Sequence, residues 1–422
     1  MVEKRTPIPV AEAVKKVMSF AKTGITEKIE LENSYGRYLA EDLKADHDVP
    51  PFDRSPYDGF AIRSVDTKRA SHSNPVEFEV IEEIGAGSVA TKSVGPLQAV
   101  RIMTGAQMPP DCDAVVMLEI TKEFEQNNRR YMSLKRRISS GDNISFQGED
   151  TKKGNVLVEK GSCINPGIIA LLATFGYDKV SVGKKPVVGI YATGTELLDV
   201  QEQLVPGKIR NSNSYMIRGQ VERAGAEPLY FGKLADDFDT CYQAVKNAID
   251  KVDLLITTGG VSVGDYDYLP AIYEKLGAVV LFNKIGMRPG SVTTVAQLDG
   301  KLLFGLSGNP SACYVGFELF ARPVVRTMLL NPKPHLMKIQ ARLNVDFPKP
   351  NPFTRFVRSK VTFEDGVVSV EPSGLDKSNV VTSLSGANSL MVLPGGTRGY
   401  EQGMNVDVLL LEDQQGCKWP WA

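Results

Sequence analysis

Cysteine and histidine are scarce in this chain, and neither is grouped. The 422 residues include five cysteines and three histidines, and no two cysteines form a CxxC pair. Disulfide frameworks and structural zinc sites depend on such residues at close, regular spacing. We therefore expect neither, and the scattered histidines likewise indicate no Ser/His/Asp or Cys/His catalytic set.

The chain also lacks an excess of charge of one sign and any long apolar run. Its 49 Lys and Arg residues balance 50 Asp and Glu residues, for a formal net charge of −1. This leaves no basic footprint for nucleic acid. No segment has the apolar length of a membrane span, and the first residues lack the apolar core of a secretory signal. We therefore expect a cytoplasmic protein that binds neither nucleic acid nor a membrane.

Glycine is plentiful, and three glycine-rich turns each follow a short run of Val, Ile or Leu. The apolar runs are 187–190, 254–256 and 302–304, and the turns are 193–196, 257–267 and 305–310. Continuous apolar runs between helical stretches are typical of buried parallel strands. Ligands bind at the carboxyl ends of such strands. We therefore expect the three turns to line one crevice suited to phosphate and a metal ion.

The order of these elements predicts an α/β protein of several domains. Strands and helices alternate between about residues 184 and 330, which predicts a doubly wound, mostly parallel α/β sheet domain. Short strand-like runs at 58–137 and beyond 334 predict β-rich domains, the second of them at the C-terminus. Apolar residues at helical spacing predict helices at 9–20 and 166–175. The length of the chain favours about three domains.

Gly308-Asn309-Pro310 stands where an expected strand gives way to a helix. Asn309 is suited to the N-cap and Pro310 to the first helical position. The free N–H groups at a helix start attract an anion. We therefore interpret Gly308 and Asn309 as ligand-binding residues, with an ordinary strand-to-helix turn as the alternative.

The turn at 257–267 combines glycine, a hydroxyl and two acids. Gly259 and Gly260 allow close backbone approach, and Ser262 offers a hydroxyl donor. Asp265 and Asp267 follow at once. Carboxylates beside a phosphate are the ligands that Mg²⁺ takes, whereas the alternative is that they cap the next helix. Asp267 is the stronger functional candidate.

Other charged residues stand near expected strand ends. Glu196 would face the same crevice, while Asp236 and Asp237 by themselves are more simply interpreted as a helix cap. Lys284 and Arg288 follow an expected strand at 279–282 and are suited to an oxyanion, with surface charge as the alternative.

In the C-terminal region, strand alternation groups the basic residues. Arg358 and Lys360 are two residues apart and would share one face of a strand. Arg355 would point to the other face, and a solvated edge is the simpler interpretation of these residues.

Six motifs in a fixed order carry a family resemblance. They are PPFDRSPYDGFA at 50–61, RIMTGA at 101–106, TGTEL at 193–197, PGKIRNSN at 206–213, GGVSVG at 259–264 and GNP at 308–310. Together they resemble the molybdopterin molybdenumtransferase family, which includes bacterial MoeA and the gephyrin E domain. The resemblance covers nearly the whole chain.

The resemblance implies an activity and an assembly. Family members use Mg²⁺ to insert molybdate into adenylylated molybdopterin and release AMP. It implies a homodimer in which Asp58 and Thr104 of one chain face the sheet domain of the other, and other molybdenum cofactor enzymes as partners. It also implies a discontinuous first domain of residues 1–44 and 150–177, an insert at 45–149, the molybdopterin-binding α/β domain at 178–330 and a C-terminal β domain at 331–422.

The resemblance further assigns functional positions residue by residue. Those implied for catalysis are Asp58, Thr104, Glu196, Asp236 and Asp267. Those implied for the metal are Asp150, Glu196, Asp236 and Asp267. Those implied for substrate binding are Lys284, Arg288, Arg358 and Ser378, which join Gly259, Gly260, Ser262, Gly308 and Asn309. The chain departs from the family pattern at Arg288, where lysine is usual, and at Ser291, which replaces a second lysine and removes a charge.

Two alternatives of other classes stay open at this point. One is a scaffold or carrier that binds molybdopterin or a partner peptide without turnover. The other is a different nucleotide enzyme on the same sheet, such as an adenylyltransferase. The motifs around Asp58 and Thr104, which lie outside the sheet domain, argue against the second.

Overall fold

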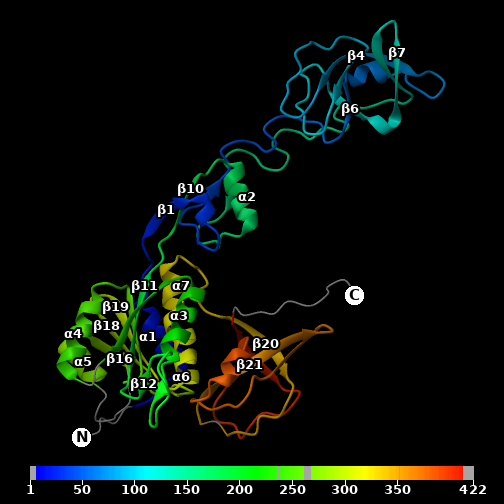
Figure 1. The fold of residues 1–422 in the computed structure, drawn as a ribbon. Coiled ribbons are helices and arrows are strands. Elements are labelled where there is room, and N and C mark those ends of the chain that lie inside the picture. Colours follow the sequence, from blue (N-terminus) through cyan, green and yellow to red (C-terminus); the bar gives the residue numbers. More distant parts are fainter. Residues whose placement is uncertain (1–5, 235–236, 261–267, 351, 412–422) are drawn as a thin grey trace. The chain divides into compact units, whose positions relative to one another are not determined.

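The computed structural model describes residues 6–234, 237–260, 268–350 and 352–411. The chain forms two compact units, of which the first comprises residues 1–41, 160–169 and 178–422 and the second comprises 42–159 and 170–177 (Figure 1). No helix among these described residues has the length and apolar character that crossing a bilayer requires.

The first unit contains the predicted α/β sheet. Its six strands lie in the order β14-β11-β15-β19-β18-β16. Their bounds are Val187–Thr193 for β11, Glu227–Leu234 for β14, Leu254–Thr258 for β15, Val279–Phe282 for β16, Thr294–Leu298 for β18 and Lys301–Leu306 for β19. Strands β14, β11, β15 and β19 are parallel, whereas β18 is antiparallel to both of its neighbours. The expectation of a doubly wound, mostly parallel sheet is confirmed.

The antiparallel strand has a local cause. Strands β18 and β19 are joined by Asp299 and Gly300, which have φ angles of 51° and 81°. Two consecutive residues with positive φ make the tight turn that matches the twist of a hairpin, and Asp-Gly is a favoured pair there. This dipeptide is the sequence signal for the antiparallel strand.

Helices cover both faces of the sheet (Figure 1). One face carries α1 (Val10–Met18), α3 (Asn213–Ala224), α6 (Pro310–Gly316), a π-helical turn (Phe317–Ala321) and α7 (Arg322–Met328). The other carries α4 (Phe238–Ile249) and α5 (Leu269–Lys275). Strand alternation explains the division, because Leu254 and Ile256 face the first group and Leu255 faces the second.

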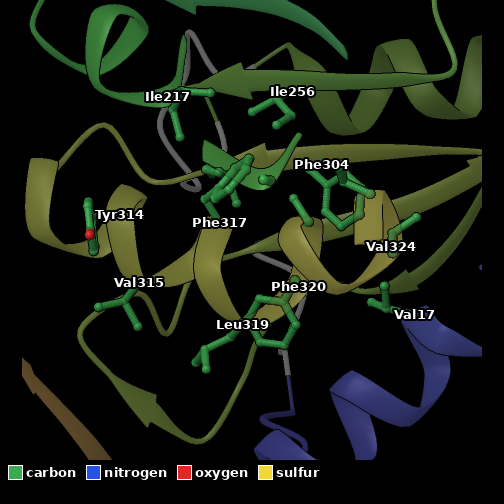
Figure 2. Packing of buried hydrophobic residues seen from close by; sticks show 14 of the residues in the cluster. Val17, Ile217, Ile256, Phe304, Tyr314, Val315, Phe317, Leu319, Phe320 and Val324 are labelled. Carbon is green, nitrogen blue, oxygen red and sulfur yellow. The ribbon is translucent and has the colours of Figure 1, made fainter. Parts of the chain in front are cut away.

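Aromatic side chains fill the larger of these two cores. Figure 2 shows Phe317 and Phe320 from the helical layer packed with Phe304 and Ile256 of the sheet. Each of these three phenylalanines is fully buried. Burial of such a side chain stabilises the fold by about 2 kcal/mol.

The helix ends in this unit follow the sequence signals. Gly225 ends α3 in the left-handed conformation, with φ of 95°. Asp237 caps α4, because its carboxylate accepts a hydrogen bond from the Thr240 N–H at 2.8 Å. The Thr240 hydroxyl, followed by the Thr240 N–H, holds the pKa of Asp237 below its ordinary value. The cap interpretation is therefore confirmed for Asp237.

The C-terminal region forms a closed β-barrel, which confirms the expectation of β-rich structure there. Strands β21-β22-β20-β24-β23 follow one another, and β23 pairs back onto β21. The strands span Met337–Leu343 (β20), Thr354–Glu364 (β21), Val367–Pro372 (β22), Ser389–Leu393 (β23) and Asn405–Leu410 (β24). Short strand β17 (Met287–Arg288) extends the sheet in parallel with the start of β21. Closure leaves few exposed strand edges.

The smaller elements of the first unit are two strand pairs and two short helices. Strand β1 (Thr26–Glu30) is antiparallel to β10 (Lys179–Gly183), and β12 (Leu197–Leu198) is parallel to β13 (Ile209–Arg210). The short helices are a 3-10 turn (Leu31–Asn33) and α8 (Thr382–Ser385). The predicted helix at 166–175 is α2 (Pro166–Thr174).

The second unit is a β-rich body, as expected. Its six-stranded sheet has the order β6-β3-β5-β4-β8-β7, and β2 pairs with β9. The strands span Leu43–Lys44 (β2), Gly59–Ile62 (β3), Val76–Ile84 (β4), Gln98–Ile102 (β5), Ala114–Met117 (β6), Thr121–Gln126 (β7), Arg129–Leu134 (β8) and Val156–Val158 (β9). Two 3-10 turns lie at Ser64–Thr67 and Leu118–Ile120.

Candidate active site

The three glycine-rich turns meet at the carboxyl ends of β11, β15 and β19. The Gly259 N–H donates to the Leu306 carbonyl at 2.8 Å. The Thr193 hydroxyl donates to the Thr258 carbonyl at 3.1 Å. We call residues 193–194, 258–260 and 307–309 the glycine edge. These contacts tie three segments that are distant in sequence into one surface.

Glycine is required at the centre of this edge by space as well as by conformation. Gly259 has φ of +94°, and a Cβ there would lie 2.6 Å from the Thr193 hydroxyl oxygen and 2.8 Å from its carbonyl oxygen. A Cβ on Gly308 would lie 3.6 Å from the Cα of Gly259. The backbones of the turns are therefore in near contact, and peptide groups rather than side chains form the surface.

Two buried polar atoms at this edge have no hydrogen-bond partner among the described residues. One is the hydroxyl of Thr258, a residue that is 2% exposed, and the other is the side-chain oxygen of Asn213. The Asn213 amide nitrogen donates to the Gly308 carbonyl at 2.8 Å, so this side chain clamps the glycine edge to the start of α3. Buried polar atoms are nearly always bonded. The Thr258 hydroxyl and the Asn213 oxygen are exceptions to this rule among the described residues.

Sequence reasoning gave no role to Asn213 or Thr258. Asn213 belongs to the NSN sequence at 211–213, which ends one of the six motifs. Its position in that motif was the available signal. Thr258 directly precedes Gly259 and offered no signal beyond its place at a strand end.

The start of α6 has the predicted form, with one amide already used inside the protein. Asn309 is the N-cap and Pro310 the first helical residue, and the Asn309 side chain makes no capping bond. The Ser311 N–H donates to the Ser378 carbonyl at 3.0 Å, and the Ser311 hydroxyl donates to the Val380 carbonyl at 2.6 Å. These bonds tie a loop of the C-terminal barrel to the helix that begins at the glycine edge.

Of the predicted acidic ligands in this unit, the structure describes Glu196. Its carboxylate folds back against Gly194, is exposed, and has no hydrogen-bond partner within the described ranges. Asp236, Ser262 and Asp267 lie outside the described residues. No group of three His, Cys, Asp or Glu side chains that could hold a metal occurs in the described part of the chain.

A second cluster of predicted residues surrounds a pocket of about 460 Å³ between β17, the start of β21 and the loop after β22. We call it the cationic pocket. Its lining residues are Arg288, Pro289, Gly290, Ser291, Arg355, Asp376, Lys377, Ser378 and Asn379. The pocket thus brings together Arg288 and Ser378, which were predicted. Its charged lining is three cations and one carboxylate.

Lys284 lies close to this pocket along the chain. The Ile285 N–H donates to the Ser291 carbonyl at 2.8 Å, which closes the segment between them into a loop. Lys284 is half-buried, and its ammonium has no ion-pair or hydrogen-bond partner in the described part of the protein.

Arg358 differs from its expected setting. It is 1% exposed, so the solvated-edge interpretation is wrong for this residue. Its guanidinium donates to Asp376, to the Ser383 hydroxyl and to the carbonyls of Leu375 and Lys377, at 3.1–3.3 Å. Burial lowers the pKa of Arg358 from its ordinary value, and the charge of Asp376 opposes that shift.

Arg355 contacts the same anion as Arg358, although the two residues stand an odd number of positions apart on β21. Its guanidinium meets the same carboxylate, at 2.5 Å from Asp376 Oδ2. Alternation along a strand fixes the direction of each Cβ, but an arginine side chain is long enough to turn toward a shared anion. Sequence reasoning missed Asp376 and Lys377, whose only signal was their position beside Ser378.

Asp58 and Thr104 form a pair in the second unit. One Asp58 carboxylate oxygen accepts from the Thr104 N–H at 2.7 Å and from the Thr104 hydroxyl at 2.8 Å. The backbone bond, followed by the hydroxyl bond, holds the pKa of Asp58 below its ordinary value. Asp150 belongs to the same unit, is exposed, and hydrogen-bonds neither residue of the pair.

A doubly wound sheet with a glycine-lined edge, tied to a pocket of excess positive charge, defines a class of proteins that bind anionic small molecules. Comparison with protein families narrows the class. Residues 8–176 match the MoeA N-terminal region (domain I and II), 189–327 match the probable molybdopterin binding domain, and 340–411 match the MoeA C-terminal region (domain IV).

Individual proteins give the same result. The chain is 63% identical over 422 residues to the molybdopterin molybdenumtransferase of Bacillus subtilis (strain 168), covering 100% of this chain and 98% of that one. It is 53% identical over 414 residues to the protein of the same name from Staphylococcus aureus (strain COL), covering 98% and 97%. The crystal structure of the molybdopterin biosynthesis MoeA protein from Pyrococcus horikoshii OT3 superimposes with a TM-score of 0.80 at 33% identity, covering 96% and 100%.

The chain therefore belongs to the MoeA family of molybdopterin molybdenumtransferases and is a transferase of molybdenum cofactor biosynthesis. The family resemblance and the fold class expected from the sequence are both confirmed.

Proposed function

We propose that this transferase inserts molybdate into adenylylated molybdopterin and releases AMP in a reaction that depends on Mg²⁺. The observation that carries the proposal is the link between two sites of different chemistry. The Ser311–Ser378 hydrogen bond joins the loop of the cationic pocket to the helix that starts at the glycine edge. One site is suited to a nucleotide-bearing substrate and the other to a compact oxyanion.

The glycine edge would hold adenylylated molybdopterin. Gly259, Gly260, Gly308 and Asn309 let the backbone come close to phosphate, and Ser262 would add a hydroxyl. The unpartnered atoms of Asn213 and Thr258 would bond polar groups of the same substrate. This assignment keeps the predicted substrate-binding role of the edge and adds two residues to it.

The cationic pocket would hold molybdate. Guanidinium and ammonium groups bind oxyanions through charge-assisted hydrogen bonds. Arg288 and Ser378 line the pocket, and Arg358 lies behind it. Lys284, which follows strand β16, would bring a further positive charge to the transferred oxyanion.

The donor chemistry of the described part is compatible with Mg²⁺. This ion takes one or two carboxylates together with water and phosphate oxygens, so a cluster of three acids is not required. Glu196 offers one carboxylate beside the glycine edge, and Asp236, Asp267 and Asp150 are the other proposed ligands. A bound Mg²⁺ would offset the negative charge that builds up on phosphate as AMP leaves.

The remaining predicted residues would act on the substrate from the second unit. Asp58 has a lowered pKa and is ionised at neutral pH, so its carboxylate accepts hydrogen bonds. We propose a homodimer in which Asp58 and Thr104 of one chain serve the sheet domain of the other, and transfer of the product to other molybdenum cofactor enzymes. The division into residues 1–44 with 150–177, 45–149, 178–330 and 331–422 stays a prediction, as does the cytoplasmic location.

A reconstituted reaction tests the proposal. The purified protein is mixed with adenylylated molybdopterin, Mg²⁺ and molybdate, and both AMP release and molybdenum retained on the pterin are followed. We expect molybdate-dependent AMP release, which Asp267→Asn abolishes. Tight pterin binding without turnover would instead support a carrier, and full turnover by Asp267→Asn would remove the proposed role of that residue.

A further inference from the structure

Two arginines line the cationic pocket, in which Asp376 is the one carboxylate among the described lining residues. Strands β17 and β21 pair in parallel, and Arg288 is the register partner of Arg355. Neighbouring strands lie about 4.8 Å apart, and like charges placed directly opposite each other are destabilising. Lys377 adds a third cation to the lining, whereas the one lining carboxylate is Asp376. Such an excess of positive charge is favourable when an anion occupies the pocket.

The two arginines of β21 differ in what they contact. The Arg358 guanidinium is buried and donates to four protein acceptors, two of them carbonyls of the loop that carries Asp376 and Ser378. The Arg358 side chain is 1% exposed and is absent from the pocket lining, whereas that of Arg355 is 12% exposed and lines the pocket. Arg355 therefore lines the pocket, whereas Arg358 contacts the loop.

Asp376 holds the arginines in this arrangement. Its carboxylate is 5% exposed and contacts Arg355 at 2.5 Å, Arg358 at 3.1 Å and Lys349 at 3.7 Å. One carboxylate shared among three cations fixes their positions, and the cations outnumber the carboxylate among these described residues. Charge at fixed positions binds an oxyanion better than mobile charge, because little ordering is needed on binding.

We propose that Arg355, positioned by Asp376, is an oxyanion-binding residue of this pocket, and that Arg358 is a positioning residue that holds the loop of Ser378. The proposal rests on the proposed function, in which the pocket takes molybdate. It also accounts for Ser291, which stands where the family pattern has a lysine. Arg355 enters the same pocket from the opposite strand and supplies the missing positive charge. The ligand class is a tetrahedral dianion.

Equilibrium dialysis of the full-length protein with molybdate, followed by metal analysis, tests the first part. We expect Arg355→Gln to weaken molybdate binding about tenfold or more, because one charge-assisted hydrogen bond is lost. Arg355→Lys keeps the positive charge but loses the paired N–H donors of the guanidinium. Its affinity for molybdate should therefore lie between those of the wild type and Arg355→Gln. Lys360→Gln is the matched control, since Lys360 is an exposed cation on the same strand and lies outside the pocket lining.

Kinetics and rescue separate binding from a structural effect. In the AMP-release assay, Arg355→Gln should raise the KM for molybdate and leave the KM for adenylylated molybdopterin unchanged. Adding Ser291→Lys to Arg355→Gln should restore at least half of the lost affinity, because it returns a cation to the pocket. Arg358→Lys should lower the melting temperature and change both KM values, because the loop loses donors.

The outcomes distinguish this proposal from the proposed function. Wild-type protein that neither binds molybdate nor releases AMP would contradict the proposed function itself. Wild-type binding with unchanged affinity in Arg355→Gln, or loss of affinity that Ser291→Lys does not restore, would overturn the role of Arg355 alone. An Arg358→Lys protein that loses molybdate affinity at unchanged melting temperature would overturn the positioning role.

Discussion

The surface of the glycine edge is formed mainly by the backbone, whereas the charged lining of the cationic pocket is formed by side chains. The edge depends on close contact between turns, in which a Cβ at Gly259 would meet Thr193. The pocket depends on ion pairs that converge on Asp376. Added volume should therefore disturb the edge more than the pocket, and removed charge should disturb the pocket more than the edge. Substitutions chosen on this basis should affect the two regions differently.

The largest effect is expected from removal of the shared carboxylate. Asp376→Ala leaves Arg355, Arg358 and Lys349 close together without their anion, and loss of one partner from a buried ion pair costs about 3 to 5 kcal/mol. Urea unfolding should show that loss in the transition of the C-terminal barrel. Asp407→Ala in the same barrel is the control, because Asp407 pairs with Lys338 at the surface, and such a pair contributes about 0 to 1 kcal/mol. Equal effects of the two substitutions would contradict the account of the pocket.

A slightly smaller effect is expected from added volume at the edge. Gly259→Ala places a methyl group 2.6 Å from the Thr193 hydroxyl at φ of +94°, and should cost about 3 kcal/mol through overpacking and strain. Gly207→Ala is the matched control, because Gly207 also has positive φ but no atom within 4 Å of its Cβ position. Thermal unfolding compares the two. If Gly207→Ala lowers the melting temperature as much as Gly259→Ala does, close contact between the turns is not the reason that Gly259 must be glycine.

Loss of the clamp on the edge should have a milder effect. Asn213→Ala removes the 2.8 Å hydrogen bond to the Gly308 carbonyl, which contributes about 1 kcal/mol to stability. It also removes the unpartnered side-chain oxygen, so the KM for adenylylated molybdopterin should rise several-fold. Ser212→Ala should change neither, since Ser212 is exposed and its side chain caps nothing. Unchanged kinetics in Asn213→Ala would remove Asn213 from the edge's function.

The smallest effect is a shift in the titration of Asp58, in the second unit. Thr104→Ala removes the hydroxyl bond to Asp58 and should raise the pKa of Asp58 toward its ordinary value near 3.8, as measured by carboxyl NMR. A carboxylate whose pKa is lowered in the folded state stabilises the fold at pH values above its pKa in the unfolded chain. The difference in stability between wild type and Thr104→Ala should therefore shrink as the pH drops below about 3.8. Asp237, whose bond to Thr240 is untouched, is an internal reference. If the pKa of Asp58 is the same in Thr104→Ala as in the wild type, the hydrogen bond from the Thr104 hydroxyl does not lower that pKa in solution.

How far the sequence could predict each region follows from the same difference. The glycine edge depends on local signals, namely apolar runs that end in Gly-rich turns, so its strands and its converging turns could be foreseen. The pocket depends on Arg355, Asp376 and Arg358, whose partners are chosen by the fold of the barrel and by the register of β17 on β21. Strand alternation predicts that Arg355 and Arg358 lie on opposite faces of the strand, but it could not predict that both long side chains reach the same carboxylate.

The measurement that tests the division of roles most directly is the AMP-release assay with both substrates varied. The account predicts that Asn213→Ala raises the KM for adenylylated molybdopterin alone and that Arg355→Gln raises the KM for molybdate alone. If each substitution instead changes both KM values by the same factor, the edge and the pocket do not bind separate substrates, and the account of this site is wrong.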